Sequence, residues 1–389
     1  MQKEQLIAKF QELYGEGGEI RTYFAPGRVN LIGEHTDYNG GHVFPCALTI
    51  GTYGVARVRK DNMLQFYSMN FEQLGVIGSR LEDLKPEKEA DWTNYPKGVI
   101  WAFDKKGYPV TSGMDLLLYG NIPNGSGLSS SASVEVLTGF ILRDFFGFDV
   151  TNQDLALIGQ YSENNFNGVN CGIMDQFAIA MGKKDHAILL DCSTLAYEYV
   201  PLKLGDYCIV VANCNKPHNL VESKYNVRRH EVEVALKKIQ EVKPIKALAE
   251  LSVEEFNEVK YLLSGVVEKR AEHVVTECAR VTEAVAALKR GDLAELGRLL
   301  NESHYSLRDL YEVTGKELDM LSSLARKEAG CLGSRMIGAG FGGCTISIVK
   351  KSAVEGFIRR VDRAYFDAIG YRASFYETSI EDGVTVSKL

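Results

Sequence analysis

The sequence predicts an α/β protein of two domains. The chain has 389 residues. This is longer than the chains that usually fold around a single compact core, which indicates two domains or one large α/β domain. Strand-like runs separated by turn residues dominate up to about residue 71, whereas helical periodicity is almost unbroken from about 221 to 329. This change of character places a boundary near residue 205, so we expect one domain over residues 1–205 and a second over 206–389.

The first domain is expected to begin with a helix and continue as a mixture of strands and helices. Apolar residues at helical spacing mark the first helix: Leu6, Ile7, Phe10 and Leu13. The segments RTYFA, RVNLIG, TYGVARVRK and LQFYSMNF then read as strands. A helix is predicted around Tyr95 to Phe103, followed by the strand MDLLLYG.

The next helix begins near a run of serines and has one apolar face. That face is formed by Val134, Leu137, Ile141 and Phe145. A further helix covers about residues 153–163, and the strands HAILLDC, AYEYVPL and YCIVVAN follow. At the other end of the chain, SRMIGAGFGGCTISIVKK, the helical VEGFIRRVDRAYFDAI and the strand RASFYETSI predict a β-α-β ending.

Composition is typical of a soluble globular protein. Hydrophobic residues make up 45% and charged residues 24% of the chain, with a net charge of −7 and no long block of one sign. Nothing indicates a nucleic-acid or membrane surface, and no run approaches the roughly 18 apolar residues of a membrane span. The eight cysteines are scattered without a C-x-x-C pair. We therefore expect a cytoplasmic protein with reduced thiols.

The segment PNGSGLSSSAS follows a strand and opens a helix, which is where a phosphate-binding loop is built. Gly125 and Gly127 allow the backbone to approach an anion, and the N–H groups of the first helical turn face it. Ser129, Ser130 and Ser131 offer an N-cap and spare hydroxyls, one of which could bind Mg²⁺. The Walker A pattern is absent, and a plain turn is the alternative.

A second glycine-rich segment, GAGFGG at Gly338 to Gly343, lies between two strand-like runs. Five glycines in six residues indicate that the backbone takes positive φ or approaches another group closely. A tight hairpin is the alternative. Two such loops in one chain favour a nucleotide held between two domains.

Three charged residues are candidates for phosphoryl-transfer chemistry. Asp175, in the Gly-flanked GVNCGIMDQF, could orient an attacking hydroxyl or accept its proton; a helix cap or solvated turn residue is the alternative. Glu163, near the end of a helix, could bind Mg²⁺ or be a solvated helix residue. Arg28 could neutralise charge on a transferring phosphoryl group or form a structural salt bridge.

The segment GRVNLIGEHTDYNGG gathers Glu34, His35, Thr36 and Asp37 after a short apolar run. These side chains offer mostly hydrogen-bond acceptors, which suits a polyhydroxylated ligand whose O–H groups each need a partner. A metal site fits less well, because only one His accompanies two carboxylates. A structural turn is the third interpretation.

Taken together, these segments resemble the galactokinases, a family of GHMP small-molecule kinases, over essentially the whole length. GRVNLIGEHTDYNGG is similar to the galactokinase signature, PNGSGLSSSAS to the ATP-phosphate loop of the GHMP kinases, and GAGFGG to their third motif. GVNCGIMDQF and SKYNVRR are further galactokinase-like stretches. The resemblance implies an N-terminal domain like the second domain of ribosomal protein S5 and a ferredoxin-like C-terminal domain.

The resemblance also implies residue roles. It implies that Asp175 is the catalytic base or hydroxyl-orienting carboxylate and that Arg28 stabilises the transition state. The implied sugar-binding residues are Glu34, His35, Thr36, Asp37, Asp175 and Tyr225. The implied ATP-binding residues are Ser68, Gly125, Ser126, Gly127, Leu128, Ser129, Ser130 and Ser131, and the implied Mg²⁺ ligands are Ser131 and Glu163. A packing role is the alternative for Tyr225.

The reaction implied is phosphorylation of D-galactose by ATP at the anomeric hydroxyl, the first committed step of the Leloir pathway. Galactose and ATP are then the partners of a monomer or weak dimer. Two alternatives remain at this stage: an N-acetylgalactosamine kinase, and a non-catalytic galactose and ATP sensor. Sensors of this kind depart from the kinases in the GLSSSA loop, whereas Ser131 and Ala132 are present here, which favours the enzyme.

Overall fold

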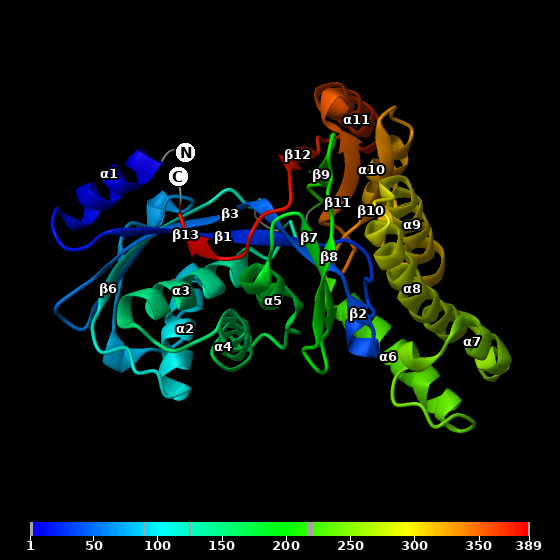
Figure 1. Ribbon diagram of the computed structural model, residues 1–389, viewed down its shortest axis with the longest axis horizontal. Coiled ribbons are helices and arrows are strands. Elements are labelled where there is room, and N and C mark those ends of the chain that lie inside the picture. Colours follow the sequence, from blue (N-terminus) through cyan, green and yellow to red (C-terminus); the bar gives the residue numbers. More distant parts are fainter. Residues whose placement is uncertain (1–2, 89–90, 124–125, 217–220, 388–389) are drawn as a thin grey trace.

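The computed structural model describes residues 3–88, 91–123, 126–216 and 221–387, which fold into two α/β parts (Figure 1). The first part is built on a six-stranded sheet with the order β13-β1-β3-β6-β4-β5. Neighbouring strands in it are antiparallel except for β4 and β6. The strands are β1 (Arg21–Asn30), β3 (Pro45–Val58), β4 (Met63–Ser68), β5 (Ile77–Arg80), β6 (Met114–Gly120) and β13 (Thr385–Val386).

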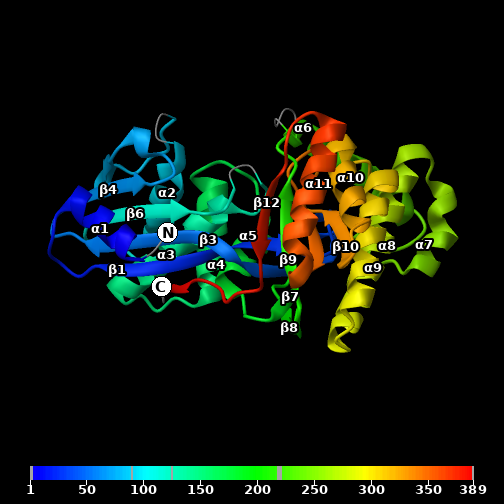
Figure 2. The same ribbon diagram turned by 90° about the horizontal axis from the view of Figure 1, so that it is seen from above.

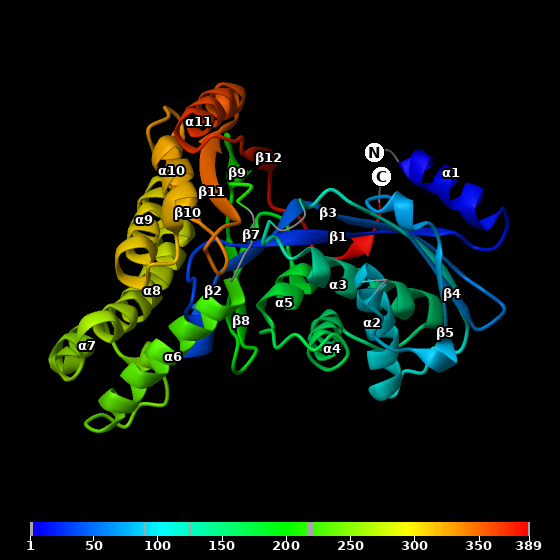
Figure 3. The same cartoon turned by 180° about the vertical axis from the view of Figure 1, so that it is seen from behind.

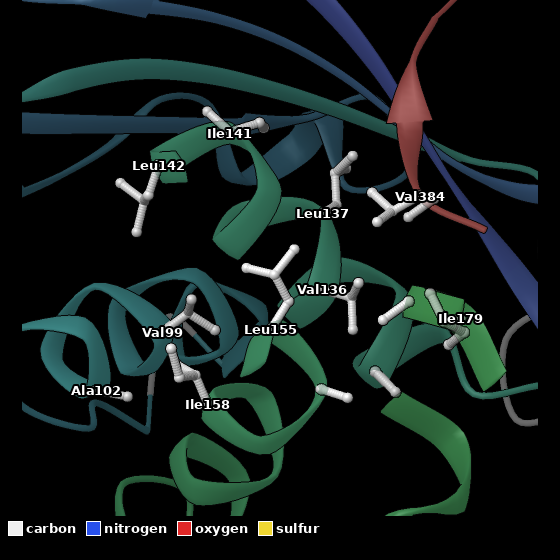
Figure 4. Packing of buried hydrophobic residues seen from close by; sticks show 14 of the residues in the cluster. Val99, Ala102, Val136, Leu137, Ile141, Leu142, Leu155, Ile158, Ile179 and Val384 are labelled. Carbon is white, nitrogen blue, oxygen red and sulfur yellow. The ribbon is translucent and has the colours of Figure 1, made fainter. Parts of the chain in front are cut away.

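Four helices cover one face of this sheet, while α1 (Lys3–Tyr14) lies on the other (Figures 1 and 3). The four are α2 (Asn94–Lys105), α3 (Ser130–Phe146), α4 (Asn152–Asn165) and α5 (Met174–Met181). Figure 4 shows the core between them, where Leu137 of α3 and Ile179 of α5 lie near Val384, and Leu155 of α4 belongs to the same cluster. Burying each such side chain contributes about 1.5–3 kcal/mol. This core therefore fixes α3 and α5, the two helices whose N-termini form the candidate site.

The second part contains a four-stranded antiparallel sheet with the order β10-β11-β9-β12. Its strands are β9 (Tyr207–Asn213), β10 (Cys331–Met336), β11 (Cys344–Lys350) and β12 (Ser374–Thr378). The helices are α6 (Val221–Gln240), α7 (Val253–Val259), α8 (Gly265–Lys289), α9 (Leu293–Ser306), α10 (Gly315–Arg326) and α11 (Val354–Ile369). In Figure 2, α8 to α11 gather at the end of the molecule away from the six-stranded sheet.

Smaller elements connect the two parts. A three-stranded sheet lies between them in the order β2-β7-β8, formed by β2 (His42–Val43), β7 (His186–Asp191) and β8 (Tyr197–Pro201) (Figure 1). Short 3₁₀ helices cover Asp37–Asn39, Glu72–Leu74, Leu81–Asp83, Asp91–Thr93, Leu248–Glu250, Lys260–Leu262 and Lys351–Ala353, and a π-helical turn covers Leu307–Tyr311. None of the described helices is both long and apolar enough to cross a membrane.

The predicted two-part α/β architecture is confirmed, with two differences in detail. RTYFA and the first three residues of RVNLIG form the single strand β1, because a bulge between Pro26 and Arg28 lets the pairing with β3 continue past the proline, whereas residues 31–33 lie beyond the strand. The chain end also returns to the first part, where Ile380 bridges Leu48 and β13 pairs with β1. The domain boundary between residues 205 and 206 stays a prediction.

Candidate active site

The loop before α3 has a backbone suited to an anion. Gly127 (φ +72°) and Ser129 (φ +63°) are both in the left-handed region, which costs a residue other than glycine about 1–2 kcal/mol. Ser126 is 2% exposed, and its hydroxyl has no hydrogen-bond partner among the described residues. A buried polar group of this kind favours a ligand at the loop. Gly125 lies outside the described residues.

The three serines are expected to supply the N-cap of α3, and a serine does stand there, but without a side-chain cap. Ser129 occupies the N-cap position, but its side chain makes no bond to the first turn of the helix. The hydroxyl instead donates to Asp175 Oδ2 at the start of α5. The first N–H groups of α3 therefore have no side-chain cap and can face an anion.

Arg28 and Asp175 join the phosphate loop to α5. The Arg28 Nε atom lies 2.8 Å from Asp175 Oδ1, and its Nη1 donates to the carbonyl oxygen of Gly127 at 2.8 Å. Arg28 is buried beside the bulge of β1, while a third of the Asp175 side chain is exposed. Arg28 thus forms a salt bridge, which is the structural alternative for this residue, and it also lies at the predicted phosphate site. Asp175 is no helix cap, because its carboxylate contacts Arg28 and Ser129.

The segment of residues 33–41, here called the acidic turn, lies against the second part of the molecule. Glu34 is 5% exposed, and its Oε1 accepts a hydrogen bond from the backbone N–H of Gly338 at 3.0 Å. The Nη2 atom of Arg335, a fully buried side chain, lies 3.0 Å from the same oxygen. One carboxylate oxygen of Glu34 is thus occupied by the glycine-rich GAGFGG segment and its neighbour.

His35 and Thr36 make contacts that hold the acidic turn itself. The ring of His35 contacts the Tyr38 hydroxyl through Nδ1 at 2.7 Å and the carbonyl of Ala339 through Nε2 at 3.1 Å. Burial lowers the pKa of His35 to about 3, so the ring is neutral. Thr36 is fully buried and donates to the carbonyls of Gly33 and His42. Both side chains therefore hold the conformation of the turn.

Asp37 lines a cavity of about 430 Å³ between the two parts. Other residues of its wall are Gln160, Cys192, Ser193, Tyr225 and Arg229. Burial, together with the negative charges of Glu34 and Asp175, raises the pKa of Asp37 to about 6. The charges of the three carboxylates therefore act on one another. Tyr225 both lines the cavity and packs, because its ring centroid is 5.7 Å from that of His35.

A second cavity, of about 210 Å³, lies beside the N-terminus of α3. Three of the predicted ATP-binding residues, Ser68, Ser130 and Ser131, are in its wall. The remaining wall is largely apolar and aromatic, and it includes Phe71, Trp92, Tyr95, Leu118, Ile122 and Val134. An apolar slot that opens beside a phosphate loop has the shape and chemistry of a nucleotide-base site.

Glu163 is buried next to a second carboxyl group. The Gln176 Nε2 atom donates to Glu163 Oε2 at 2.8 Å and to Glu135 Oε2 at 3.0 Å. Burial raises the pKa of both glutamates, and their mutual repulsion raises that of Glu135 further. Glu135 Oε1 has no hydrogen-bond partner among the described residues. Two crowded acidic groups fit a divalent cation, which needs only one or two carboxylates when phosphate oxygens supply other ligands.

The GAGFGG segment brings the two glycine-rich loops together. At Gly340 (φ +84°) a Cβ atom would lie 2.2 Å from the carbonyl oxygen of Val313, so only glycine fits there. A Cβ atom at Gly343 would lie 3.7 Å from the carbonyl oxygen of Ser126 in the phosphate loop. The loops are therefore adjacent, as a nucleotide held between them requires.

Sequence reasoning missed three residues of the site. Arg335 is paired with Glu34, and Glu135 and Gln176 surround Glu163. One signal was present for Glu135, because it follows Ser131 by four residues and so lies one helical turn further along the same face of α3. For Arg335 and Gln176 the partners lie on other elements, and no local pattern marks them.

Three segments of the chain match known protein families. Residues 8–58 match the galactokinase galactose-binding signature, residues 94–183 the N-terminal domain of GHMP kinases, and residues 284–368 the GHMP kinase C-terminal family. Among solved structures, the galactokinase of Lactococcus lactis complexed with galactose is similar at a TM-score of 0.93, with 49% identity and 99% of each chain covered. A mevalonate kinase of Methanococcus jannaschii has a TM-score of 0.68 at 16% identity, covering 94% of this chain and 99% of that one, which shows the shared fold.

Curated relatives match the chain over nearly its full length. The galactokinase of Clostridium acetobutylicum is 56% identical over 379 residues, 97% of each chain. That of Fusobacterium nucleatum is 55% identical over 383 residues, 98% of each chain. At this coverage the matches span both parts of the fold. The chain belongs to the galactokinase family of the GHMP kinases.

Proposed function

We propose that this protein transfers the γ-phosphoryl group of ATP to the anomeric 1-hydroxyl of D-galactose, giving galactose 1-phosphate and ADP. The observation that carries the proposal is the contact of Arg28 with both Asp175 and Gly127. It joins a carboxylate beside the larger cavity to the phosphate loop. The two substrates would therefore meet where the hydroxyl and the phosphoryl group have to react.

Galactose occupies the 430 Å³ cavity in this proposal. Asp37 and Tyr225 line it and bind sugar hydroxyls, and Asp175 contacts the reacting one. Glu34 contributes the carboxylate oxygen that Gly338 and Arg335 leave free. A sugar lacking one of these hydroxyls would leave a carboxylate unpaired, which makes such a site selective.

Asp175 orients the anomeric hydroxyl and accepts its proton as the oxygen attacks the γ-phosphorus. The attack needs little covalent help from the protein, since phosphoryl transfer depends mainly on positioning and on stabilising charge. Arg28 stays ionised and presents donors in a fixed plane. Lying between Asp175 and the phosphate loop, it stabilises negative charge on the transferring group.

ATP binds with its phosphates at residues 126–131 and its base in the 210 Å³ cavity. The uncapped first turn of α3 supplies backbone N–H groups, and Ser126, Ser130 and Ser131 supply hydroxyls. The family's use of ATP implies a divalent cation, and we propose Mg²⁺ held by Ser131 and Glu163. When bound, it neutralises charge on the phosphate oxygens. Glu135 and Gln176 hold Glu163 in place.

The test is ADP release by the purified protein with MgATP and a panel of sugars: galactose, glucose, N-acetylgalactosamine, 2-deoxygalactose and none. We expect galactose-dependent turnover. If N-acetylgalactosamine is preferred, the sugar assignment is wrong. If galactose binds in calorimetry but no sugar on the panel is turned over, the protein is a sensor and the proposed activity is wrong.

The kcat/KM for galactose is expected to fall as the pH drops below about 6. The raised pKa of Asp37, about 6 in the free enzyme, means that the carboxylate that accepts sugar hydroxyls is protonated on the acid side. Because kcat/KM reports groups of the free enzyme, it should fall about tenfold per pH unit there. Initial rates between pH 5 and 8 at saturating ATP measure this, and the acid limb should be missing in Asp37→Asn. If kcat/KM of Asp37→Asn falls on the acid side in the same way, the fall is caused by another titrating group.

Replacing Trp92 by Ala is expected to raise the KM for ATP about tenfold with little change in the KM for galactose. Stacking of a base on an aromatic ring contributes about 1–3 kcal/mol, and Trp92 lines the proposed base cavity. The matched control is Trp101→Ala, the other tryptophan of the chain, which stacks on Tyr161 at 5.6 Å. If the two substitutions raise the KM for ATP equally, the base does not bind in this cavity.

A further inference from the structure

Helix α8 carries three buried polar residues on one face. Arg270, His273 and Glu277 follow one another at spacings of three and four residues, so they share one side of the helix. Arg270 is 3% exposed, and His273 and Glu277 are fully buried. Burying such groups is costly unless each is paired. The hydrogen-bond partners of these three side chains therefore indicate the role of this face of α8.

Glu277 holds the start of the acidic turn. Its Oε1 accepts a hydrogen bond from the backbone N–H of Gly33 at 3.0 Å and another from the Ser303 hydroxyl at 2.6 Å. Its Oε2 accepts from Arg280 Nε at 2.7 Å. Gly33 has a φ of +98°, and a Cβ atom there would lie 2.9 Å from Val281, also on α8. The turn is thus seated directly on this helix.

His273 holds the next residue of the turn. Its Nε2 lies 3.2 Å from the backbone carbonyl of Glu34, and its Nδ1 lies 2.8 Å from the Ser306 hydroxyl. Burial lowers the pKa of His273 to about 4, so the ring is neutral and donates through only one nitrogen. Since a carbonyl can only accept, Nε2 carries the proton. The contact therefore fixes the peptide group of Glu34.

Arg270 supports the other side of the sugar cavity. Its Nε donates to Glu231 of α6 at 2.7 Å, and its Nη1 donates to the Leu310 carbonyl at 2.7 Å. Helix α6 carries Tyr225, and the segment after Leu310 carries Tyr311, whose hydroxyl lies 2.7 Å from that of Tyr38. The same face of α8 thus braces both walls of the cavity.

We propose that His273 and Glu277 are positioning residues for galactose, which fix the backbone of Gly33 and Glu34 so that the acidic turn presents its carboxylates to the sugar. The proposal rests on the function proposed above. It makes sugar binding depend on a helix of the second part, although most of the sugar cavity is formed by the first. Neither side chain touches the ATP cavity, so nucleotide binding should not depend on them.

The test compares two variants of this face with a matched histidine. His273→Asn and Glu277→Met are expected to raise the Kd for galactose, measured by calorimetry, about tenfold, since misplacing a binding group by a fraction of an ångström is enough to weaken a site. The KM for ATP should stay within about twofold. Glu277→Gln keeps an acceptor for the Gly33 N–H and should restore most of the galactose affinity.

The control is His304→Asn on α9. His304 is also fully buried and contacts Asp319 and the backbone N–H of Met336, but not the acidic turn. The His304→Asn substitution should lower the melting temperature of the protein without changing its Kd for galactose. The proposal is overturned if His304→Asn weakens galactose binding as much as His273→Asn, or if the α8 variants weaken galactose and ATP in parallel. A wild-type protein that does not bind galactose would instead refute the proposed function.

Discussion

Asp175→Asn is expected to lower kcat at least about a hundredfold while the KM for ATP changes less than about twofold. A positioned acid–base group contributes roughly 10²–10⁴ in rate. The amide keeps the shape of the carboxylate but cannot take the proton of the anomeric hydroxyl. An interaction used only in the transition state reduces kcat and kcat/KM together. Steady-state rates at saturating galactose and MgATP, with calorimetry of ATP binding, measure both quantities.

The matched control is Asp37→Asn, a second carboxylate of the same region. It is expected to raise the KM for galactose more than it lowers kcat, because its contacts are made with bound sugar as well as with the transition state. Asp175→Asn also removes the charge partner of the buried Arg28, so the folding of each variant is checked by thermal unfolding. A folded Asp175→Asn enzyme with kcat within fivefold of wild type would rule out the catalytic role.

The parts of the site that could be predicted from the sequence are those encoded by neighbouring residues. Gly127 and the serines of residues 126–131 mark the turn into α3 because the positive φ angles at Gly127 and Ser129 demand particular residue types. The predicted face of α3 is confirmed, since Leu137 and Ile141 are fully buried. The apolar spacing that predicted it is a property of one helix alone.

The parts that could not be predicted depend on contacts between residues that are far apart in the chain. Glu34 reads as a ligand-binding carboxylate in its own segment, but its hydrogen bond from Gly338 and its ion pair with Arg335 appear only when the two parts pack. Ser129 reads as a helix cap, and its contact with Asp175 requires the N-termini of α3 and α5 to meet. The return of β13 to β1 has no local signal either, because a two-residue strand is too short to show a period.

Arg335→Met is expected to lower the free energy of unfolding by about 3–5 kcal/mol, the usual cost of breaking a buried ion pair by removing one partner. Arg335 is fully buried, donates to the carbonyls of Asn30 and Leu31, and lies 3.0 Å from Glu34 Oε1. Methionine fills much of the space but leaves the Glu34 carboxylate without its counter-charge. Urea unfolding followed by fluorescence measures the loss.

The double variant Glu34→Gln with Arg335→Met separates charge from packing. Removing both charges leaves no uncompensated ion in the interior, so the double variant should be more stable than Arg335→Met alone. It should still bind galactose poorly, because the acidic turn has lost both a sugar-facing carboxylate and the side chain that holds it against β10. Stability that is not regained in the double variant would show that Arg335 acts through its hydrogen bonds to Asn30 and Leu31. The ion pair would then contribute to sugar binding alone.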